Sequence, residues 1–152
     1  MHDPLYARAL VLKQPRGQVV LVSCDLMGVT SELYNAILTK VRRKMPLKRS
    51  EFVLFATHTH SGAGGLSDRF AMRLVGGRFR PKLFAAVTDK ISAAIVEAAQ
   101  RAEPATLAYG GVEVEAINKN RGHSNGAVDR GLKVLRIERE KGRPLAWLVN
   151  FG

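Results

Sequence analysis

Two histidines, His58 and His60, are the residues of this sequence whose types and spacing could do chemistry. They follow the apolar run at residues 52–56 and precede the glycines of the string THTHSGAGG at residues 57–65. Alternate side chains of a β-strand point to the same face, so we expect both imidazoles together at the C-terminal end of a strand. Imidazoles bind metals and carry protons, and α/β sheets place their sites at such strand ends. The alternative is one surface histidine and one core histidine.

A carboxylate occupies the equivalent place after another apolar segment. Asp25 directly follows the run at residues 19–24, which has the composition of a buried strand. An aspartate there could hold the second ring nitrogen of a metal-bound histidine. A turn or helix-capping role explains the residue equally well.

Hydrophobic periodicity predicts the elements that must position these residues. Strands are expected at residues 6–12, 19–24, 52–57, 106–115, 132–138 and 145–151. Helices are expected from Thr30 or Ser31 to about Met45, and from Pro81 to about Arg101. Residues 61–79 read as an irregular, glycine-rich loop at the rim of a site, and residues 141–144 as a turn. The pair Gly110–Gly111 suggests a bulge or bend.

The resulting order is β-β-α-β-α-β-β-β, which predicts an α/β (α+β) fold. We expect one mixed sheet of about six strands, covered by two main helices. The first two strands should form a hairpin, and the second should lie in the centre of the sheet, covered on both faces. We expect residues 1–152 to be a single, partial domain, because Gly152 directly follows a strand that reads as buried.

The charge of the chain restricts its partners. The sequence carries 24 Lys and Arg against 13 Asp and Glu, a net charge of +11. Such a balance favours phosphate groups, either of nucleic acid or of an anionic membrane surface. The alternative is that this chain belongs to a larger protein whose remainder is acidic. The basic residues are scattered and not interleaved with aromatic residues, which makes a nucleic-acid-binding module the weaker reading.

No apolar run is long enough to span a bilayer, and the first residues do not have the pattern of a signal peptide. The single cysteine, Cys24, allows no internal disulfide and does not distinguish compartments.

Segments spread over nearly the whole chain resemble one known family. The most specific is ATHTHSG at residues 56–62, and the others are individually weaker. They comprise residues 2–9, residues 20–25, Ile117 with Asn120-Arg121, Val128-Asp129 with Leu135-Arg136, and residues 147–152. In order and spacing they are similar to the N-terminal catalytic domain of neutral/alkaline, non-lysosomal ceramidases.

The resemblance implies a zinc amidohydrolase that cleaves the N-acyl bond of ceramide into sphingosine and a fatty acid. It implies that His58 is a zinc ligand and that His60 acts near the metal and the scissile carbonyl. It also implies that Arg121 faces the site, that Ser61 and Gly62 contact substrate, and that the protein is secreted, periplasmic or membrane-associated. The loop after Arg121 departs from the family pattern.

The resemblance further implies that the other zinc ligands, a histidine, a glutamate and a tyrosine, lie in the remainder of the polypeptide beyond Gly152. Zinc in catalytic sites usually has three protein ligands. We therefore expect this chain alone to bind zinc poorly and to lack amidase activity. A ceramidase-like hydrolase of another amide or ester is the nearest alternative function.

Overall fold

A computed structural model describes residues 3–139 and 142–152 of the chain. His2, at the start of one family-like segment, and residue 141, in a predicted turn, lie outside the described residues. The chain divides into two compact units, residues 1–102 and residues 103–152.

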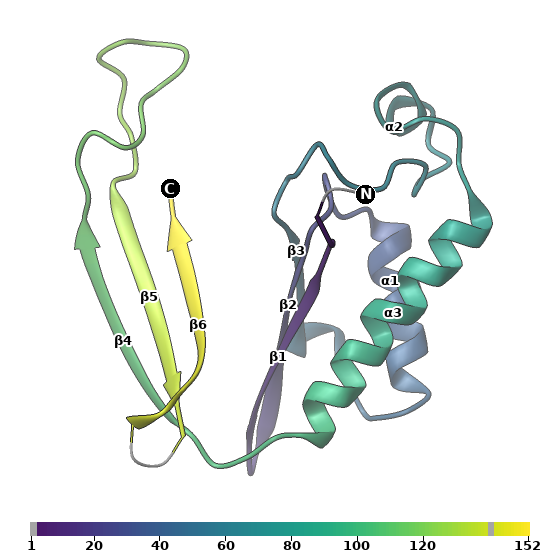
Figure 1. The fold of residues 1–152 in the computed structure, drawn as a ribbon, viewed down its shortest axis with the longest axis horizontal. Coiled ribbons are helices and arrows are strands. Elements are labelled where there is room, and N and C mark those ends of the chain that lie inside the picture. The colour runs from purple at the N-terminus through teal and green to yellow at the C-terminus, as the bar shows by residue number, and fades with distance from the viewer. Residues whose placement is uncertain (1–2, 140–141) are drawn as a thin grey trace. The chain divides into compact units, whose positions relative to one another are not determined.

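The first unit contains a three-stranded sheet, a short 3-10 helix and three α-helices (Figure 1). In chain order the elements are β1 (Ala7–Gln14), β2 (Gly17–Cys24), α1 (Ser31–Arg42), η1 (Arg49–Glu51), β3 (Phe52–Ala56), α2 (Phe70–Gly76) and α3 (Pro81–Gln100). The strands lie in the order β1-β2-β3. β1 and β2 form the predicted antiparallel hairpin, and β3 runs parallel to β2 after the crossover through α1.

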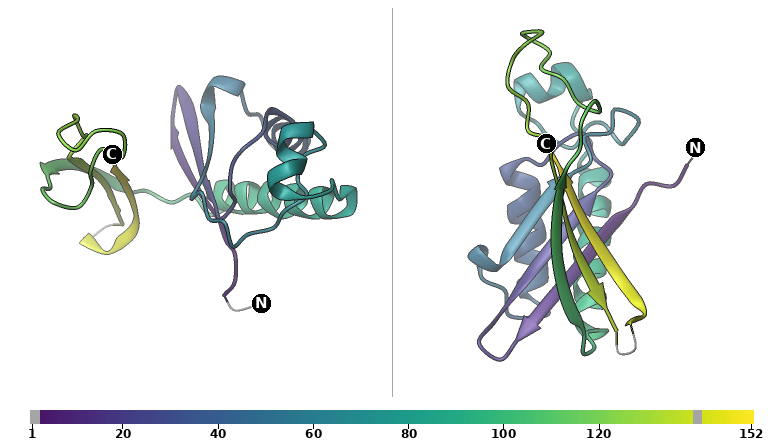
Figure 2. Two further views of the ribbon diagram at one scale, coloured as in Figure 1. Left: turned by 90° about the horizontal axis from the view of Figure 1, so that it is seen from above. Right: turned by 90° about the vertical axis from the view of Figure 1, so that its left-hand side faces the viewer.

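The core of this unit lies between the sheet and the helices α1 and α3, which cover the same face of the sheet (Figure 2). Val20 and Val22 of β2 are fully buried on that face, whereas Val19 on the other face is 42% exposed. The predicted central position of β2 is confirmed. The predicted cover on both faces is not met within this unit, because both long helices pack on one side.

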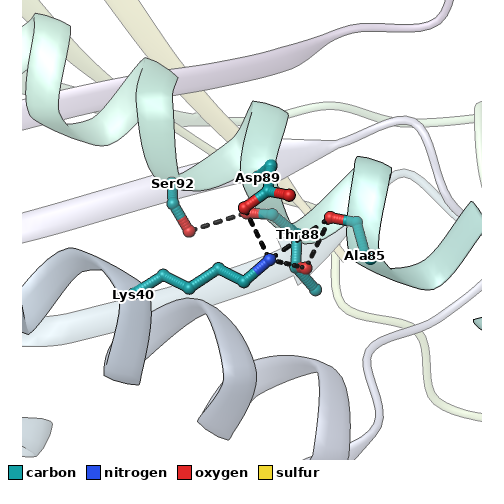
Figure 3. Close-up of polar contacts among 5 residues, drawn as sticks. All are labelled: Lys40, Ala85, Thr88, Asp89 and Ser92. Atoms are coloured by element: carbon teal, nitrogen blue, oxygen red, sulfur yellow. Dashed lines mark hydrogen bonds and ion pairs between the residues drawn. The ribbon is translucent and has the colours of Figure 1, made fainter. Parts of the chain in front are cut away.

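A polar network joins α1 to α3 at the edge of the core (Figure 3). The Nζ atom of Lys40 donates to Oγ1 of Thr88 at 2.8 Å and to Oδ1 of Asp89 at 2.6 Å. Thr88 is fully buried, and its hydroxyl donates in turn to the carbonyl of Ala85 at 2.9 Å. The network therefore supplies a buried hydroxyl with two partners and links the helices beside their apolar contact.

The second unit is an antiparallel meander of β4 (Thr106–Glu113), β5 (Gly131–Glu138) and β6 (Pro144–Phe151). The pairing of β4 with β5 runs without interruption past Gly110 and Gly111. The bulge predicted at this glycine pair is therefore wrong. The register shift of the sheet lies between Ile137 and Glu138, where β5 meets β6.

The α+β class and the predicted order of strands and long helices are confirmed. Two features differ from the prediction. The described strands form two sheets of three, in place of one sheet of about six. The segment expected to be irregular contains the helix α2, whose apolar residues are largely exposed and therefore give no core-facing stripe.

Candidate active site

The two histidines lie in the loop that leaves β3, and both are exposed. The strand ends at Ala56, and the N–H of Thr57 still donates to the carbonyl of Cys24 at 3.0 Å. The next residue, His58, has a φ of 60°, in the left-handed region that few residues other than glycine adopt. Strand geometry therefore stops before the first histidine. Non-glycine residues held at positive φ are concentrated at functional sites.

His58 and His60 are brought together, as the sequence predicted, although by the turn at His58 and not by strand alternation. Their ring centroids are 5.0 Å apart and the rings are nearly perpendicular. The two Nε2 atoms are 3.4 Å apart. Nδ1 of His58 lies 2.6 Å from the carbonyl oxygen of Met27. Because a carbonyl only accepts, Nδ1 must carry a proton, and this leaves the lone pair of Nε2 free in the neutral ring.

The Nε2 atom of His58 matches one ligand of a zinc site. A backbone carbonyl that orients the other ring nitrogen is a common support for metal-binding histidine. The Nε2 atom of His60 lies 3.4 Å from this ligand atom, within reach of a group that would be bound beside it. Among residues 3–139 and 142–152, no group of three or more His, Cys, Asp or Glu side chains could hold a metal ion. The described residues thus offer fewer metal ligands than the three that are usual in a catalytic zinc site.

Asp25 has a different role from the one predicted. The place against the ring nitrogen of His58 is taken by the Met27 carbonyl. The Asp25 carboxylate instead accepts from the N–H of Tyr6 at 2.9 Å and from Nη1 of Arg8 at 3.3 Å. It also accepts from Oγ1 of Thr57 at 3.3 Å. Through these bonds the carboxylate links the backbone before β1 to Thr57, the residue that precedes His58.

The pKa of Asp25 reflects these contacts. The hydrogen bond from the Tyr6 N–H is the main cause that holds the pKa of this carboxyl below its usual value. The hydrogen bonds from Arg8 and Thr57 act in the same direction, because each favours the ionised form. At neutral pH the residue is therefore a fixed negative charge beside the histidine loop.

Ser61 and Gly62, the predicted substrate contacts, continue the same loop. The N–H of Ser61 donates to Oγ1 of Thr59 at 3.2 Å, and the Ser61 side chain is exposed. A Cβ atom at Gly62 would lie 3.2 Å from the carbonyl oxygen of Asp25. The glycine therefore allows the histidine loop to pack against the end of β2.

The next two glycines have a structural use that the sequence did not reveal. A Cβ atom at Gly64 would collide with the carbonyl oxygen of Gly76, at the end of α2. Gly65 has a φ of +75°, its N–H donates to the Gly76 carbonyl, and its own carbonyl accepts from the N–H of Arg80 at 2.9 Å. These two glycines therefore let the α2 segment pack against the histidine loop.

Arg121 belongs to the second unit and is exposed in the loop between β4 and β5. The side chain of the preceding residue shapes that loop. Oδ1 of Asn120 accepts from the N–H of Gly122 at 2.9 Å and from the N–H of His123 at 3.0 Å. Asn120 thus presents Arg121 on a tight polar turn.

Sequence reasoning missed the Met27 carbonyl, the positive φ of His58 and the helix α2. No sequence signal marks a backbone carbonyl as a histidine partner. The apolar residues between Phe70 and Val75, next to a pair of glycines, could have indicated a short helix with a cap at Gly77.

The chain is similar to several known proteins. Over residues 1–148 the sequence matches the model of a family described as neutral/alkaline non-lysosomal ceramidase, N-terminal. A neutral ceramidase from Pseudomonas aeruginosa is 33% identical over 125 residues, which cover 80% of this chain and 19% of that protein. Neutral ceramidase A from Dictyostelium discoideum is 28% identical over 169 residues, which cover 100% of this chain and 24% of that protein.

Two solved structures are similar as well. A crystal structure of the neutral ceramidase from Pseudomonas aeruginosa has a TM-score of 0.88 at 28% identity, covering 99% of this chain and 26% of that one. A structure described as "Ceramidase complexed with C2" has a TM-score of 0.85 at 28% identity, covering 95% and 25% of the two chains. The chain spans about a fifth to a quarter of the length of these relatives.

Proposed function

Because the chain belongs to the neutral/alkaline non-lysosomal ceramidase family, we propose that it forms part of a zinc-dependent amidohydrolase. The reaction would be hydrolysis of the N-acyl amide bond of ceramide or a closely related lipid, which yields sphingosine and a fatty acid. The two similar neutral ceramidases and the solved ceramidase complexed with C2 support this choice of substrate class.

One observation carries the proposal: the ring nitrogens of His58 and His60 meet at 3.4 Å, and the Met27 carbonyl fixes the tautomer of His58. This arrangement prepares the Nε2 atom of His58 to hold a metal. Zinc, when bound, would polarise the amide carbonyl and lower the pKa of a water molecule to about 7.

The chain's own residues would supply the remaining steps. His60, within hydrogen-bond reach of the same point, would take up and deliver a proton at neutral pH. Arg121 would provide a fixed positive charge for the negative oxygen that develops in amide hydrolysis. Ser61 and Gly62, next to the histidines, would contact the substrate.

A zinc titration of the chain, followed by calorimetry, tests the assignment of His58. We expect an affinity weaker than about micromolar, because the described residues contain no group of three possible metal ligands. We also expect no amidase activity from this chain by itself. The weak binding should disappear in His58→Ala and persist in His123→Ala, which changes an exposed histidine of the second unit.

Either of two results would contradict this proposal. A micromolar or tighter affinity that is lost in His58→Ala would show that the chain completes a zinc site without further ligands. Weak binding that survives in His58→Ala but is lost in His123→Ala would move the metal to the other histidine.

Hydrolysis of another amide or ester is the alternative. The loop around Arg121 favours considering it, because Gly122 and His123 depart from the family pattern that the sequence otherwise follows. A substrate panel on the full-length protein, with ceramides, short N-acyl amines and simple esters, separates the two. Faster turnover of a short amide or an ester than of ceramide would favour the alternative.

A further inference from the structure

The helix α2 presents an apolar face that nothing in its own unit covers. Phe70, Leu74 and Val75 are 76%, 72% and 68% exposed, more than the other large apolar residues of this unit. Side chains on a helix are spaced by about 100° per residue, so these three and Ala71 occupy one continuous arc of about 140°. Met72 and Gly76 lie on the opposite side, where Met72 is half-buried and lines a small pocket with Leu26, Leu33 and Leu66. Met72 therefore faces the first unit, and the apolar arc faces away from it.

The position of α2 is fixed by backbone and side-chain contacts. The Gly65 N–H bonds the Gly76 carbonyl at the end of the helix. At its start, Nε and Nη2 of Arg69 donate to Oε1 of Glu32 at 2.9 Å and 2.6 Å. Figure 1 shows α2 at the same end of this unit at which β2 and β3 end. The face thus lies at the end of the sheet that carries the histidine loop.

Positive charges outnumber negative ones around this face, where the nearby carboxylates are Asp68, which precedes the segment, and Glu32, which pairs with Arg69. Residues 69–82 contain five basic side chains and no acidic one. All five are exposed, and they are Arg69, Arg73, Arg78, Arg80 and Lys82. Within the part of the chain that the structure describes, only Arg69 of this set forms an ion pair. An exposed apolar helix face bordered by cations is the pattern of elements that lie in the interface of an anionic membrane.

We propose that residues 69–82 dock the protein on an anionic lipid membrane, with Phe70, Leu74 and Val75 inserted at the boundary between headgroups and acyl chains. Arg73, Arg78, Arg80 and Lys82 contact the lipid phosphates. This docking rests on the proposed function only in that a lipid substrate resides in a membrane. Docking itself requires neither zinc nor hydrolysis. Among residues 3–139 and 142–152, no helix is long and apolar enough to cross a membrane.

Vesicle flotation of the chain tests the proposal. We expect binding to vesicles of phosphatidylcholine mixed with phosphatidylglycerol and weaker binding to phosphatidylcholine alone. Salt should weaken binding to the anionic vesicles, because it screens the arginines from the lipid phosphates. Phe70→Ser and Leu74→Ser should each lower the partition coefficient about tenfold, because each removes an inserted apolar side chain. Arg73→Gln should lower it about fivefold on the anionic vesicles.

Matched variants keep the test specific. Val112→Ser changes an exposed apolar residue of β4, and Arg43→Gln changes an exposed cation at the end of α1, so neither should affect flotation. Circular dichroism checks that the variants fold. In a Trp147→Phe background, Phe70→Trp should show a blue shift of its fluorescence on anionic vesicles and none with phosphatidylcholine at high salt.

Several outcomes would overturn the proposal. They are no flotation of the unmodified chain, flotation that survives Phe70→Ser combined with Leu74→Ser, and a self-associated chain that the same variants make monomeric. The third outcome would assign the apolar face of α2 to contact with a second copy of the chain. If the full-length protein bound vesicles equally well with and without these substitutions, membrane binding would belong to another segment. His58→Ala should bind vesicles as the unmodified chain does, so failure of the metal proposal and failure of docking are distinguishable.

Discussion

Asp25 shows how a single carboxylate can hold several segments in place near a candidate site. It contacts the backbone before β1, the side chain of Arg8 and the hydroxyl of Thr57, which precedes His58. A neutral amide keeps the shape of this side chain but accepts hydrogen bonds less strongly than a carboxylate. The charge of Asp25 should therefore matter for the stability of the first unit.

We predict that Asp25→Asn lowers the melting temperature at neutral pH. The pKa of Asp25 is lowered in the folded state, mainly by the Tyr6 N–H, so its contribution is fully present above the usual aspartate pKa of about 3.9. The contribution is lost as the pH falls through the lower folded-state pKa. The difference between Asp25→Asn and the unmodified chain should thus shrink in acid, and Asp68→Asn, at an exposed aspartate, should show no such difference. A gap that widens on acidification would contradict this assignment.

Cys24 lies one residue earlier and is buried in the core. Burial, and secondarily the negative charge of Asp25, raises the pKa of its thiol to about 11. The folded protein therefore holds the thiol in its neutral, unreactive form at neutral pH.

We predict that the single cysteine reacts with iodoacetamide at least tenfold more slowly in the folded chain than in urea. The same shift predicts that stability falls as the pH rises above about 8.5, where the unfolded chain loses the thiol proton and the folded chain keeps it. Urea unfolding at a series of alkaline pH values measures this, with Cys24→Ala as the control that should lose this contribution. Equal alkylation rates in the folded and unfolded chain would show that the thiol is accessible.

At the scale of elements, hydrophobic periodicity predicted the helices and strands whose apolar residues pack in the core. The helix at Ser31–Arg42 follows from its apolar stripe and from Thr30, whose side chain accepts from the N–H of Leu33 as an N-cap. The helix α2 was missed because its apolar residues face outward. The two histidines were expected together, but the turn at His58 depends on a backbone conformation that no residue pattern near it demands.

The division of strands into sheets is less well specified by a single sequence than the pairing in a hairpin. The alternation at residues 132–138 predicts a strand, and the structure gives β5 over Gly131–Glu138. It does not predict how many strands share one sheet, because hydrogen bonds between strands are made by a backbone that is the same in every residue. For that reason six strands could be located, while their division into two sheets of three could not.

The contact of Lys40 with α3 gives a prediction at this scale. Lys40→Met should lower the free energy of unfolding by about 1–2 kcal/mol, because it removes the bonds of Nζ to Thr88 and Asp89. The methionine side chain can still pack as the methylene stem of Lys40 does, so the expected loss of stability comes from the missing hydrogen bonds and ion pair. Lys44→Met, at an exposed lysine beyond the end of α1, is the matched control and should change stability by less than about 0.5 kcal/mol. Equal effects of the two substitutions in urea unfolding would show that the network contributes nothing specific.

For the whole molecule, part of the large positive charge serves the fold itself. The Nζ atom of Lys13 donates to the carbonyl of Ala99 at 2.8 Å, and Nε of Arg42 donates to the carbonyl of Leu47 at 2.8 Å. Lys13 thus satisfies a backbone carbonyl in the last turn of α3, where positive charge is favourable, and Arg42 links the end of α1 to the loop that follows it. A net charge of +11 is therefore not evidence of nucleic-acid binding by itself.

The two units differ in how much core they contain, and this predicts how they fold. Among the described residues, every buried apolar side chain except Ile137 lies in residues 1–102. The second unit is a three-stranded sheet in which all of β4 is exposed, and such a sheet without a covered face is not stable alone. We predict that a fragment of residues 1–102 unfolds cooperatively in urea with a mixed helix and strand circular dichroism spectrum. A fragment of residues 103–152 should give the spectrum of an unfolded chain at all urea concentrations, and a cooperative transition in that fragment would contradict the prediction.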